Sequence, residues 1–301
     1  MYKSRTHLRV LKDWQPAHVV LQRLEGSGFD LLSRINMDYR VTIDFLLALV
    51  DSYSIELSYF IISEERIAPT LEDVARITGF PIDGMPVTGC DYKAAECSDI
   101  CNELVLSARF LHEKNKCDII IKELLHFKDI SLDIVGAGLD PYVRAYVLYV
   151  IGCFLMPPRD SRLVPCMYLS LLRNADAIRN YAWGAALLCH LYHSLREFKM
   201  TRINGKNPKI MSFCAPFLTV GWSQSVERKS RNCYNKKKRE EFDLMLTSDN
   251  IMWRPYARLR DDFLPNYLIR QMSLALSCTI LICFEKLAYH RLDLCPLKLN
   301  L

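Results

Sequence analysis

The sequence predicts a mainly α-helical protein: a single helical domain with a small β-hairpin near residues 57–69. Apolar residues recur at helical spacing along most of the 301 residues. Strand-favouring residues gather in one short run, "LSYFIISEERIAPT" at 57–70. The chain is long enough to bury a sizeable core, and its 50% hydrophobic and 24% charged residues exclude wholesale disorder.

The first elements are two amphipathic helices followed by the hairpin. Apolar spacing predicts a helix over 17–25 that ends at Gly26, and a second helix over 40–53. In the run at 57–70, the polar residues 63–66 interrupt β-branched and aromatic residues, which is typical of a hairpin turn.

The next stretch, "PTLEDVARITGFPIDGMPVTG" at 69–89, combines a helix start with a loop rich in Gly and Pro. Thr70 and Asp73 have the spacing of a capping box with Asp in place of Glu, and Leu71 and Val74 begin an apolar side. Gly79 is expected to end this helix, and a turn and a short extended piece should follow. We interpret the stretch as fold-defining rather than as a binding surface. Pro81, Gly84 and Pro86, which follow the helix within this stretch, leave no room for a recognition helix straight after the turn.

Beyond residue 90 the pattern is mostly helical. Periodicity predicts helices over 98–114, 117–127, 141–156, 176–198 and 265–284. The apolar segment 210–222 contains Pro216, which should end or kink a helix there.

Cysteine usage and segment lengths indicate a reduced, intracellular, non-membrane protein. Several of the twelve cysteines lie inside apolar runs such as "YVIGCFLM", and the first residues lack an apolar signal core. The longest apolar runs, 147–156 and 272–284, are shorter than the roughly 20 residues that a spanning helix needs. We therefore expect both runs to be buried helices.

Motifs for cofactor chemistry are missing from the sequence. It contains no Gly-rich phosphate loop, no Gly-x-Ser-x-Gly elbow and no Cys-x-x-Cys pair. His190 and His193 could share a helix face as metal ligands, but ordinary packing is the favoured interpretation. A nucleophilic Cys and His pair stays open, because such partners meet in space rather than along the chain. We expect no cofactor and no metal.

A dense basic cluster occupies "RKSRNCYNKKKR" at 228–239, without an acidic residue. Three interpretations are open: a solvated loop, a nuclear-import signal, or contacts to nucleic-acid phosphates. The seven basic residues are Arg228, Lys229, Arg231, Lys236, Lys237, Lys238 and Arg239.

Several ordered blocks resemble the plant mobile domain, a family also catalogued as aminotransferase-like and found in MAINTENANCE OF MERISTEMS-like proteins. The blocks are the stretch at 59–89, "YVLYVIGCFLM" with its continuation through "RNYAWGAALLCHLYHSL", and "WRPYARLRDDFLPNYLIRQ". The resemblance implies a domain over 18–293, an N-terminal segment over 1–17 and a divergent tail over 294–301. The motif positions are Thr70, Leu71, Asp73, Val74, Gly79, Pro81, Asp83, Gly84, Pro86, Val87, Gly89, Gly152, Tyr181, Trp183 and Gly184.

The resemblance implies a non-enzymatic nuclear factor linked to meristem maintenance and silencing of transposable elements. A serine/threonine phosphatase-like protein and chromatin factors are the partners it implies. No segment supplies the lysine and phosphate-holding groups of a pyridoxal phosphate site, so the aminotransferase-like label does not predict an enzyme. The alternative is a transposon-derived protein that binds nucleic acid through residues 228–239. The usual Trp-Ala-Trp-Glu-Arg-Phe stretch is replaced around "FCAPFLTVGWSQSVERKSR", a departure from the family pattern.

Overall fold

The computed structural model describes residues 14–32, 43–62, 65–104, 106–130, 134, 136–160, 162–206, 214, 217–218, 256 and 263–295. Within these ranges the protein is mainly α-helical with small antiparallel sheets, as predicted, and the single-domain part of the prediction stays a prediction. Most of the buried apolar residues, from Trp14 to Ala288, join in one hydrophobic cluster. The domain boundaries at 1–17, 18–293 and 294–301 stay predictions.

The N-terminal elements agree with the sequence patterns. Helices α2 (His18–Arg23) and α3 (Ile43–Ser52) lie within the two predicted ranges. The predicted hairpin is confirmed, since Phe60 pairs with Ile67 and Ile62 with Glu65 in antiparallel register. The structure adds a short third strand before it, so this sheet consists of β1 (Tyr53–Ser54), β2 (Tyr59–Ile62) and β3 (Glu65–Ile67).

The region after α4 (Leu71–Thr78) is less helical than predicted. Helix α5 (Ala94–Glu103) begins earlier than the predicted range 98–114 and ends before Ser107, whose φ of 65° turns the chain. The predicted helix over 117–127 is wrong at its start, because Asp118–Ile120 forms strand β4 against Leu163–Pro165, strand β5. The consecutive isoleucines favour a strand here. The remainder of the predicted range, residues 121–127, forms a 3-10 helix. The 3-10 helices are Ala108–Phe110 and Ile121–Phe127.

The two long central helices follow. A 3-10 turn (Gly136–Leu139) leads into α6 (Asp140–Val150), which continues as a π-helix (Ile151–Leu155), so the helix predicted over 141–156 is confirmed. The helix predicted over 176–198 is split. Its beginning forms a 3-10 helix, and Tyr181 leaves the helix to bridge Met85. The elements after β5 are the 3-10 helices Cys166–Leu172 and Ala175–Asn180 and helix α7 (Trp183–Ile203).

The prediction of a helix over 265–284 is wrong in its second half. Helices α10 (Asn266–Ile269) and α11 (Met272–Ala275) are short, and strands β6 (Thr279–Cys283) and β7 (Lys286–His290) form a hairpin. β-Branched residues favour the strand, and Phe284 takes a φ of 56° in the two-residue turn, as tight hairpins require. A last 3-10 turn is Leu292–Leu294. The segment 210–222 lies almost entirely outside the described residues.

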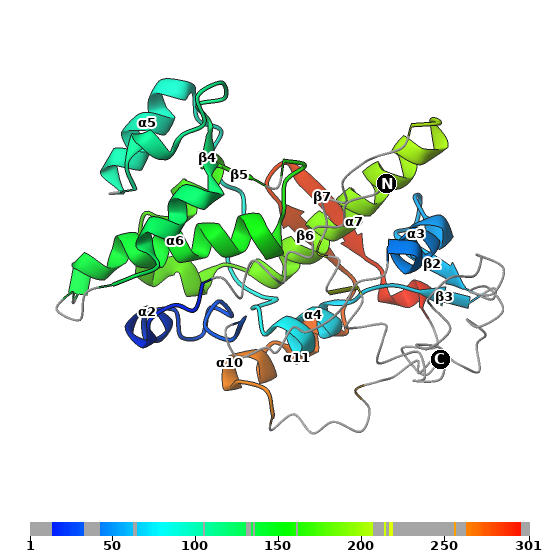
Figure 1. Ribbon diagram of the computed structural model, residues 1–301. Coiled ribbons are helices and arrows are strands. Elements are labelled where there is room, and N and C mark those ends of the chain that lie inside the picture. Colours follow the sequence, from blue (N-terminus) through cyan, green and yellow to red (C-terminus); the bar gives the residue numbers. More distant parts are fainter. Residues whose placement is uncertain are drawn as a thin grey trace.

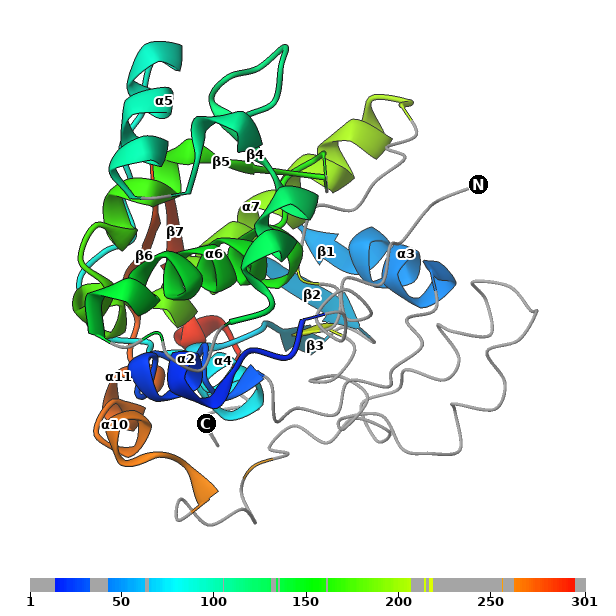
Figure 2. The same cartoon turned by 60° about the vertical axis from the view of Figure 1, so that its left-hand side comes forward.

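Helix α7 crosses the middle of the molecule (Figure 1), and the turned view shows the same arrangement (Figure 2). It packs against α4, α3, β1 and the β6–β7 hairpin, while α6 packs against the 3-10 helix 121–127. Its buried residues surround the axis, the pattern of a core helix rather than of a surface helix. Among the residues that the structure describes, no helix combines the length and the apolar character needed to cross a membrane.

Shortening a buried side chain of α7 should destabilise the protein. Leu187 is fully buried in the core, so we expect Leu187→Ala to lower the free energy of unfolding by about 2–5 kcal/mol. Met200→Ala on the same helix, where the side chain is 41% exposed, is the matched control and should change stability by less than about 0.5 kcal/mol. Urea unfolding followed by circular dichroism measures both. Equal losses would contradict the central position of α7.

Candidate functional site

The family-motif stretch begins with the start of α4. The predicted capping box is present: the Thr70 hydroxyl accepts a hydrogen bond from the Asp73 amide at 3.2 Å, and the Asp73 carboxylate accepts from the Thr70 amide at 2.7 Å. The Leu71 amide donates to His290 Nε2 at 3.3 Å, and His290 Nδ1 donates to the Ser277 carbonyl at 2.7 Å. Three amide donors that a helix start leaves unpaired are thus satisfied, one of them by His290 of the distant β7.

The end of α4 brings the chain onto the start of α7. Gly79 adopts the left-handed conformation with φ 76°, which ends the helix, and Tyr267 donates to its carbonyl at 2.6 Å. The Gly184 amide donates to the Pro81 carbonyl at 2.7 Å. A Cβ atom at Gly184 would lie 2.9 Å from both the Phe80 and the Pro81 carbonyl oxygens. Only glycine allows helix α7 to approach this closely.

The following residues form a strap, which we define as residues 79–89, across the start of α7. Backbone hydrogen bonds join the Met85 amide to the Asn180 carbonyl at 2.7 Å and the Ala182 amide to the Met85 carbonyl at 2.9 Å. Gln271 Oε1 accepts from the Ile82 amide at 2.8 Å, and Asp83 Oδ1 accepts from the Gly84 amide at 2.8 Å. Side chains at the tip, Asp83 and Pro86 among them, are exposed.

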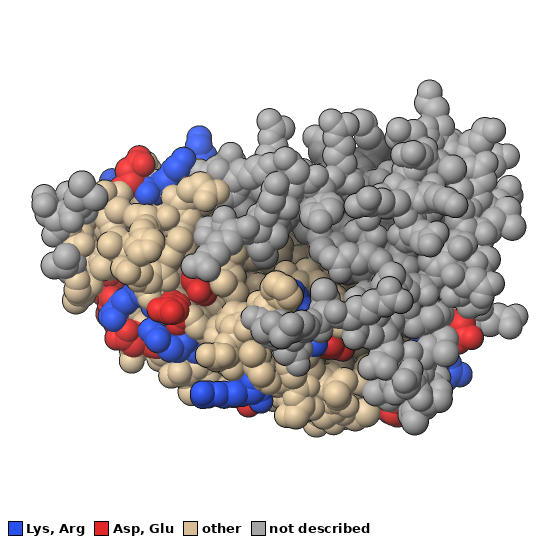
Figure 3. Space-filling model, turned by 90° about the horizontal axis from the view of Figure 1, so that it is seen from below, with Lys and Arg blue, Asp and Glu red and all other residues tan. Residues whose placement is uncertain are grey.

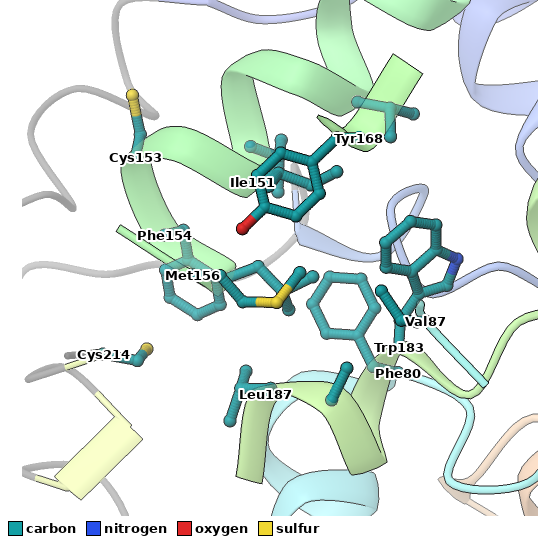
Figure 4. Packing of buried hydrophobic residues seen from close by; sticks show 14 of the residues in the cluster. Phe80, Val87, Ile151, Cys153, Phe154, Met156, Tyr168, Trp183, Leu187 and Cys214 are labelled. Atoms are coloured by element: carbon teal, nitrogen blue, oxygen red, sulfur yellow. The ribbon is translucent and has the colours of Figure 1, made fainter. Parts of the chain in front are cut away.

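The end of the strap meets the C-terminal hairpin. Val87 is fully buried and bridges Cys283, and its carbonyl accepts from the Phe284 amide at 2.7 Å. Gly89 lies against the Phe284 ring. Figure 4 shows Phe80, Val87 and Trp183 close together in the core with Tyr168 and Met156.

The remaining motif positions also lie in or beside the core. Trp183 is fully buried, and its indole donates to the Ile178 carbonyl at 2.7 Å. Its ring contacts Phe29 and Tyr181 at centroid distances of 5.3 and 5.6 Å. Gly152, in the π-helix, lies against Ile121 and Val164. The structure thus joins the motif positions of 70–89 and 181–184, and places Gly152 beside β5.

The histidines and cysteine of α7 have separate partners. His190 is buried and shares a 3.3 Å hydrogen bond with the Ser194 hydroxyl, whereas His193 donates to the Leu287 carbonyl at 2.8 Å. Burial raises the pKa of the Cys189 thiol to about 12, which disfavours its nucleophilic form. Within the described ranges, no three or more His, Cys, Asp or Glu side chains are grouped to hold a metal ion.

One surface cluster of acids and bases lies at the β4–β5 end. Asp160 accepts two hydrogen bonds from Arg162, at 3.0 and 2.7 Å, and these bonds lower its pKa to about 2. Partial burial raises the pKa of Asp118, and the charge of Asp160 adds to this effect. These groups are exposed or half-buried at the surface. The arrangement is that of a surface ion pair, to which we assign no acid–base chemistry.

A shallow cleft of about 520 Å³ opens beside β1. Its lining includes residues 51–56, Ile61 and Lys199. The Lys199 ammonium donates to the carbonyls of Asp51 and Tyr53, and Arg202 forms a 3.2 Å ion pair with Asp51. The cationic groups at this cleft therefore tie the end of α7 to β1.

An apolar surface lies on the C-terminal hairpin. Alternate residues of β6 and β7 face α7 and are buried, and their neighbours face outward. We call Ile280, Ile282, Leu287 and Tyr289 the hairpin outer face. Cross-strand pairing sets Ile280 opposite Tyr289 and Ile282 opposite Leu287. Ile280, Leu287 and Tyr289 are 55%, 60% and 65% exposed. Sequence reasoning missed this surface, although the alternation in "TILIC" and "KLAYH" signals two strands.

The seven basic residues of the cluster, Arg228 to Arg239, lie outside the described residues. On the face seen from below, the described Lys and Arg side chains lie intermixed with Asp and Glu (Figure 3). The described part of that face therefore has no surface of a single charge sign that would mark a phosphate-binding site.

The family model of the plant mobile domain matches residues 29–220 of this chain. The chain therefore belongs to the plant mobile domain family, and the resemblance seen in its motifs is confirmed. No solved structure matches.

Three relatives from Arabidopsis thaliana align with nearly the whole chain. Protein MAIN-LIKE 1 is 26% identical over 98% of this chain and 61% of its own length. Protein MAINTENANCE OF MERISTEMS is 24% identical over 99% of this chain and 65% of its own length. Serine/threonine-protein phosphatase 7 long form homolog is 24% identical over 96% of this chain and 24% of its own length. The chain thus spans from about a quarter to about two thirds of these relatives.

Removing the hydroxyl of Thr70 should weaken the start of α4. We expect Thr70→Ala to lower the free energy of unfolding by about 1 kcal/mol, since the Asp73 amide loses its acceptor. Thr70→Ser keeps the hydroxyl and is the control. Thermal unfolding of the three proteins provides the comparison, and no difference between the Ala and Ser variants would contradict the role of this cap.

Adding one methyl group at Gly184 should destabilise the protein. In an ordinary helix, Gly→Ala stabilises by roughly 0.5–1 kcal/mol. Here the new Cβ would meet the backbone oxygens of Phe80 and Pro81, so we expect Gly184→Ala to cost about 1–3 kcal/mol. Chemical unfolding measures the sign directly. An increase in stability would show that the strap and α7 are not held this closely.

Proposed function

We propose that this protein is a non-enzymatic nuclear factor that acts as a protein-interaction module in meristem maintenance and in silencing of transposable elements. Family membership and the name of the relative MAINTENANCE OF MERISTEMS support the biological setting. The interior placement of most motif positions supports the non-enzymatic part, because the packing and backbone bonds of the fold employ them.

The hairpin outer face is the observation that carries the interaction proposal. It presents four large apolar residues in cross-strand pairs on a two-stranded sheet, three of them more than half exposed. Contiguous apolar surface of this kind marks binding sites in soluble proteins, because covering it removes apolar area from water. Buried contacts of the other side with α7 hold the hairpin in place, so the surface is preformed.

A serine/threonine phosphatase-like protein is the partner that we propose for this surface, with chromatin factors as further partners of the complex. One relative that aligns with 96% of this chain carries the name of such a phosphatase and is about four times longer than the aligned part. A region similar to this chain therefore occurs within a protein named as a phosphatase. We propose that this chain meets a phosphatase-like protein as a separate molecule.

Charge placed on the hairpin outer face should abolish capture of this partner. We expect Leu287→Glu to reduce recovery of a phosphatase-like protein from plant nuclei by roughly tenfold or more, since an unpaired charge would be buried in an apolar contact. Ile203→Glu, at the end of α7, is the matched control because Ile203 is 62% exposed and Leu287 is 60% exposed. Affinity capture of the intact chain with mass spectrometry, after nuclease treatment, measures recovery.

Equal recovery by both variants would contradict the assignment of this surface, and the absence of any phosphatase-like protein would contradict the partner.

The alternative function is direct nucleic-acid binding through residues 228–239. Replacing the seven basic residues of this cluster with glutamine should then abolish retention on DNA and flatten its dependence on salt. Under the interaction proposal, partner capture survives this change. The same variant in a fluorescent fusion tests whether the cluster directs nuclear import.

A further inference from the structure

Four cysteines from three segments come together where α5 meets the β4–β5 pair. Cys97 and Cys101 are four residues apart on α5, so they share one helix face. Cys117 precedes β4 and Cys166 follows β5, and the Cys166 amide donates to the Cys117 carbonyl at 2.9 Å. Figures 1 and 2 both show α5 beside β4 and β5 at one end of the molecule.

Two thiols of this cluster share one acceptor. Cys97 and Cys117 both donate to the carbonyl of Tyr92, at 3.9 and 3.4 Å, so their sulfur atoms meet at the same oxygen. Cys101 lies one helical turn beyond Cys97, and the backbone hydrogen bond to Cys117 brings Cys166 to the same end of the β4–β5 pair. The described residues include no group suited to a metal ion, so we treat the cluster as thiols rather than as a metal centre.

The four cysteine side chains differ in their exposure to solvent. Cys97, Cys101 and Cys166 are buried, whereas Cys117 is partly exposed. A small oxidant from solvent therefore reaches Cys117 first. Burial raises the pKa of the neighbouring Cys97 to about 12, so Cys97 stays a thiol and does not react first with a peroxide.

We propose that Cys117 and Cys97 form a reversible disulfide when a peroxide oxidises Cys117. The Cys117 thiolate attacks one peroxide oxygen, the O–O bond breaks, and a sulfenic acid and hydroxide form. The Cys97 sulfur then attacks the sulfenic sulfur. An S–S bond forms, the S–O bond breaks, and the leaving hydroxide takes the Cys97 proton as water. In total, two thiols and one hydrogen peroxide give one disulfide and two waters.

The disulfide would attach α5 to the start of β4. It closes the loop from residue 97 to residue 117, which includes the connection between α5 and the strand. Closing a loop lowers the entropy of the unfolded chain, so the oxidised protein should unfold at a higher temperature than the reduced one. Thiol reductants should reverse the change.

The experiment treats the purified full chain with hydrogen peroxide under native conditions, blocks free thiols by alkylation and maps tryptic peptides by mass spectrometry. The sequence places the cysteines in three different peptides: 94–109 holds Cys97 and Cys101, 117–122 holds Cys117, and 163–173 holds Cys166. We expect a disulfide between peptides 94–109 and 117–122 that is lost on reduction. The melting temperature of the same sample should rise by several degrees and return with reductant.

Single variants identify the sulfur within peptide 94–109. Cys97→Ser should abolish the linked peptide, Cys101→Ser should retain it, and Cys278→Ser is the control because Cys278 is exposed on another part of the chain. Circular dichroism checks that each variant is folded. Three outcomes would overturn the proposal: a link that depends on Cys101 instead of Cys97, a link only to peptide 163–173, or Cys117 that is oxidised to sulfinic acid without any link.

Discussion

The close contact between the strap and the start of α7 is the constraint on which the rest of the fold depends. One hydrogen bond of 2.7 Å, from the Gly184 amide to the Pro81 carbonyl, marks the point where two backbones meet. Side chains larger than glycine would separate them. The contact sets the distance of α4 from α7, and the bonds between Met85 and Ala182 extend it along the strap. At the end of the strap, the bridge between Val87 and Cys283 connects it to the C-terminal hairpin.

The residues that build the fold differ from the residues that are exposed for binding. Most motif positions are occupied with caps, tight turns and core contacts, as the Asp73 carboxylate and the Trp183 indole illustrate. The inner side of the β6–β7 hairpin packs against α7, whereas the residues of its outer face are mostly exposed and have no comparable structural role among the described residues. A family whose motif encodes a rigid frame can vary its surfaces while the frame remains.

The accuracy of the sequence patterns differed with the kind of information that each element needs. The capping box at Thr70, the left-handed Gly79 and the hairpin near 57–69 involve neighbours in sequence, and all three are confirmed. The predictions of helices over 117–127 and 265–284 were wrong in part of each range, because short apolar runs fit helix and strand patterns alike. Pairing with β5 in one case, and packing on α7 in the other, selected the strand.

Local chemistry alone decides the mainly helical class, the motif at 69–89 and the membership in the plant mobile domain family, because these depend on residue order. Three-dimensional packing decides where the motif lies, which face of the β6–β7 hairpin meets water, and which cysteines share an acceptor. Cys97 and Cys117 illustrate the reason: they are separated along the chain, and only the meeting of α5 with β4 places both thiols on the Tyr92 carbonyl. Contacts of this kind depend on loop closure and core packing, which no single stretch of sequence specifies.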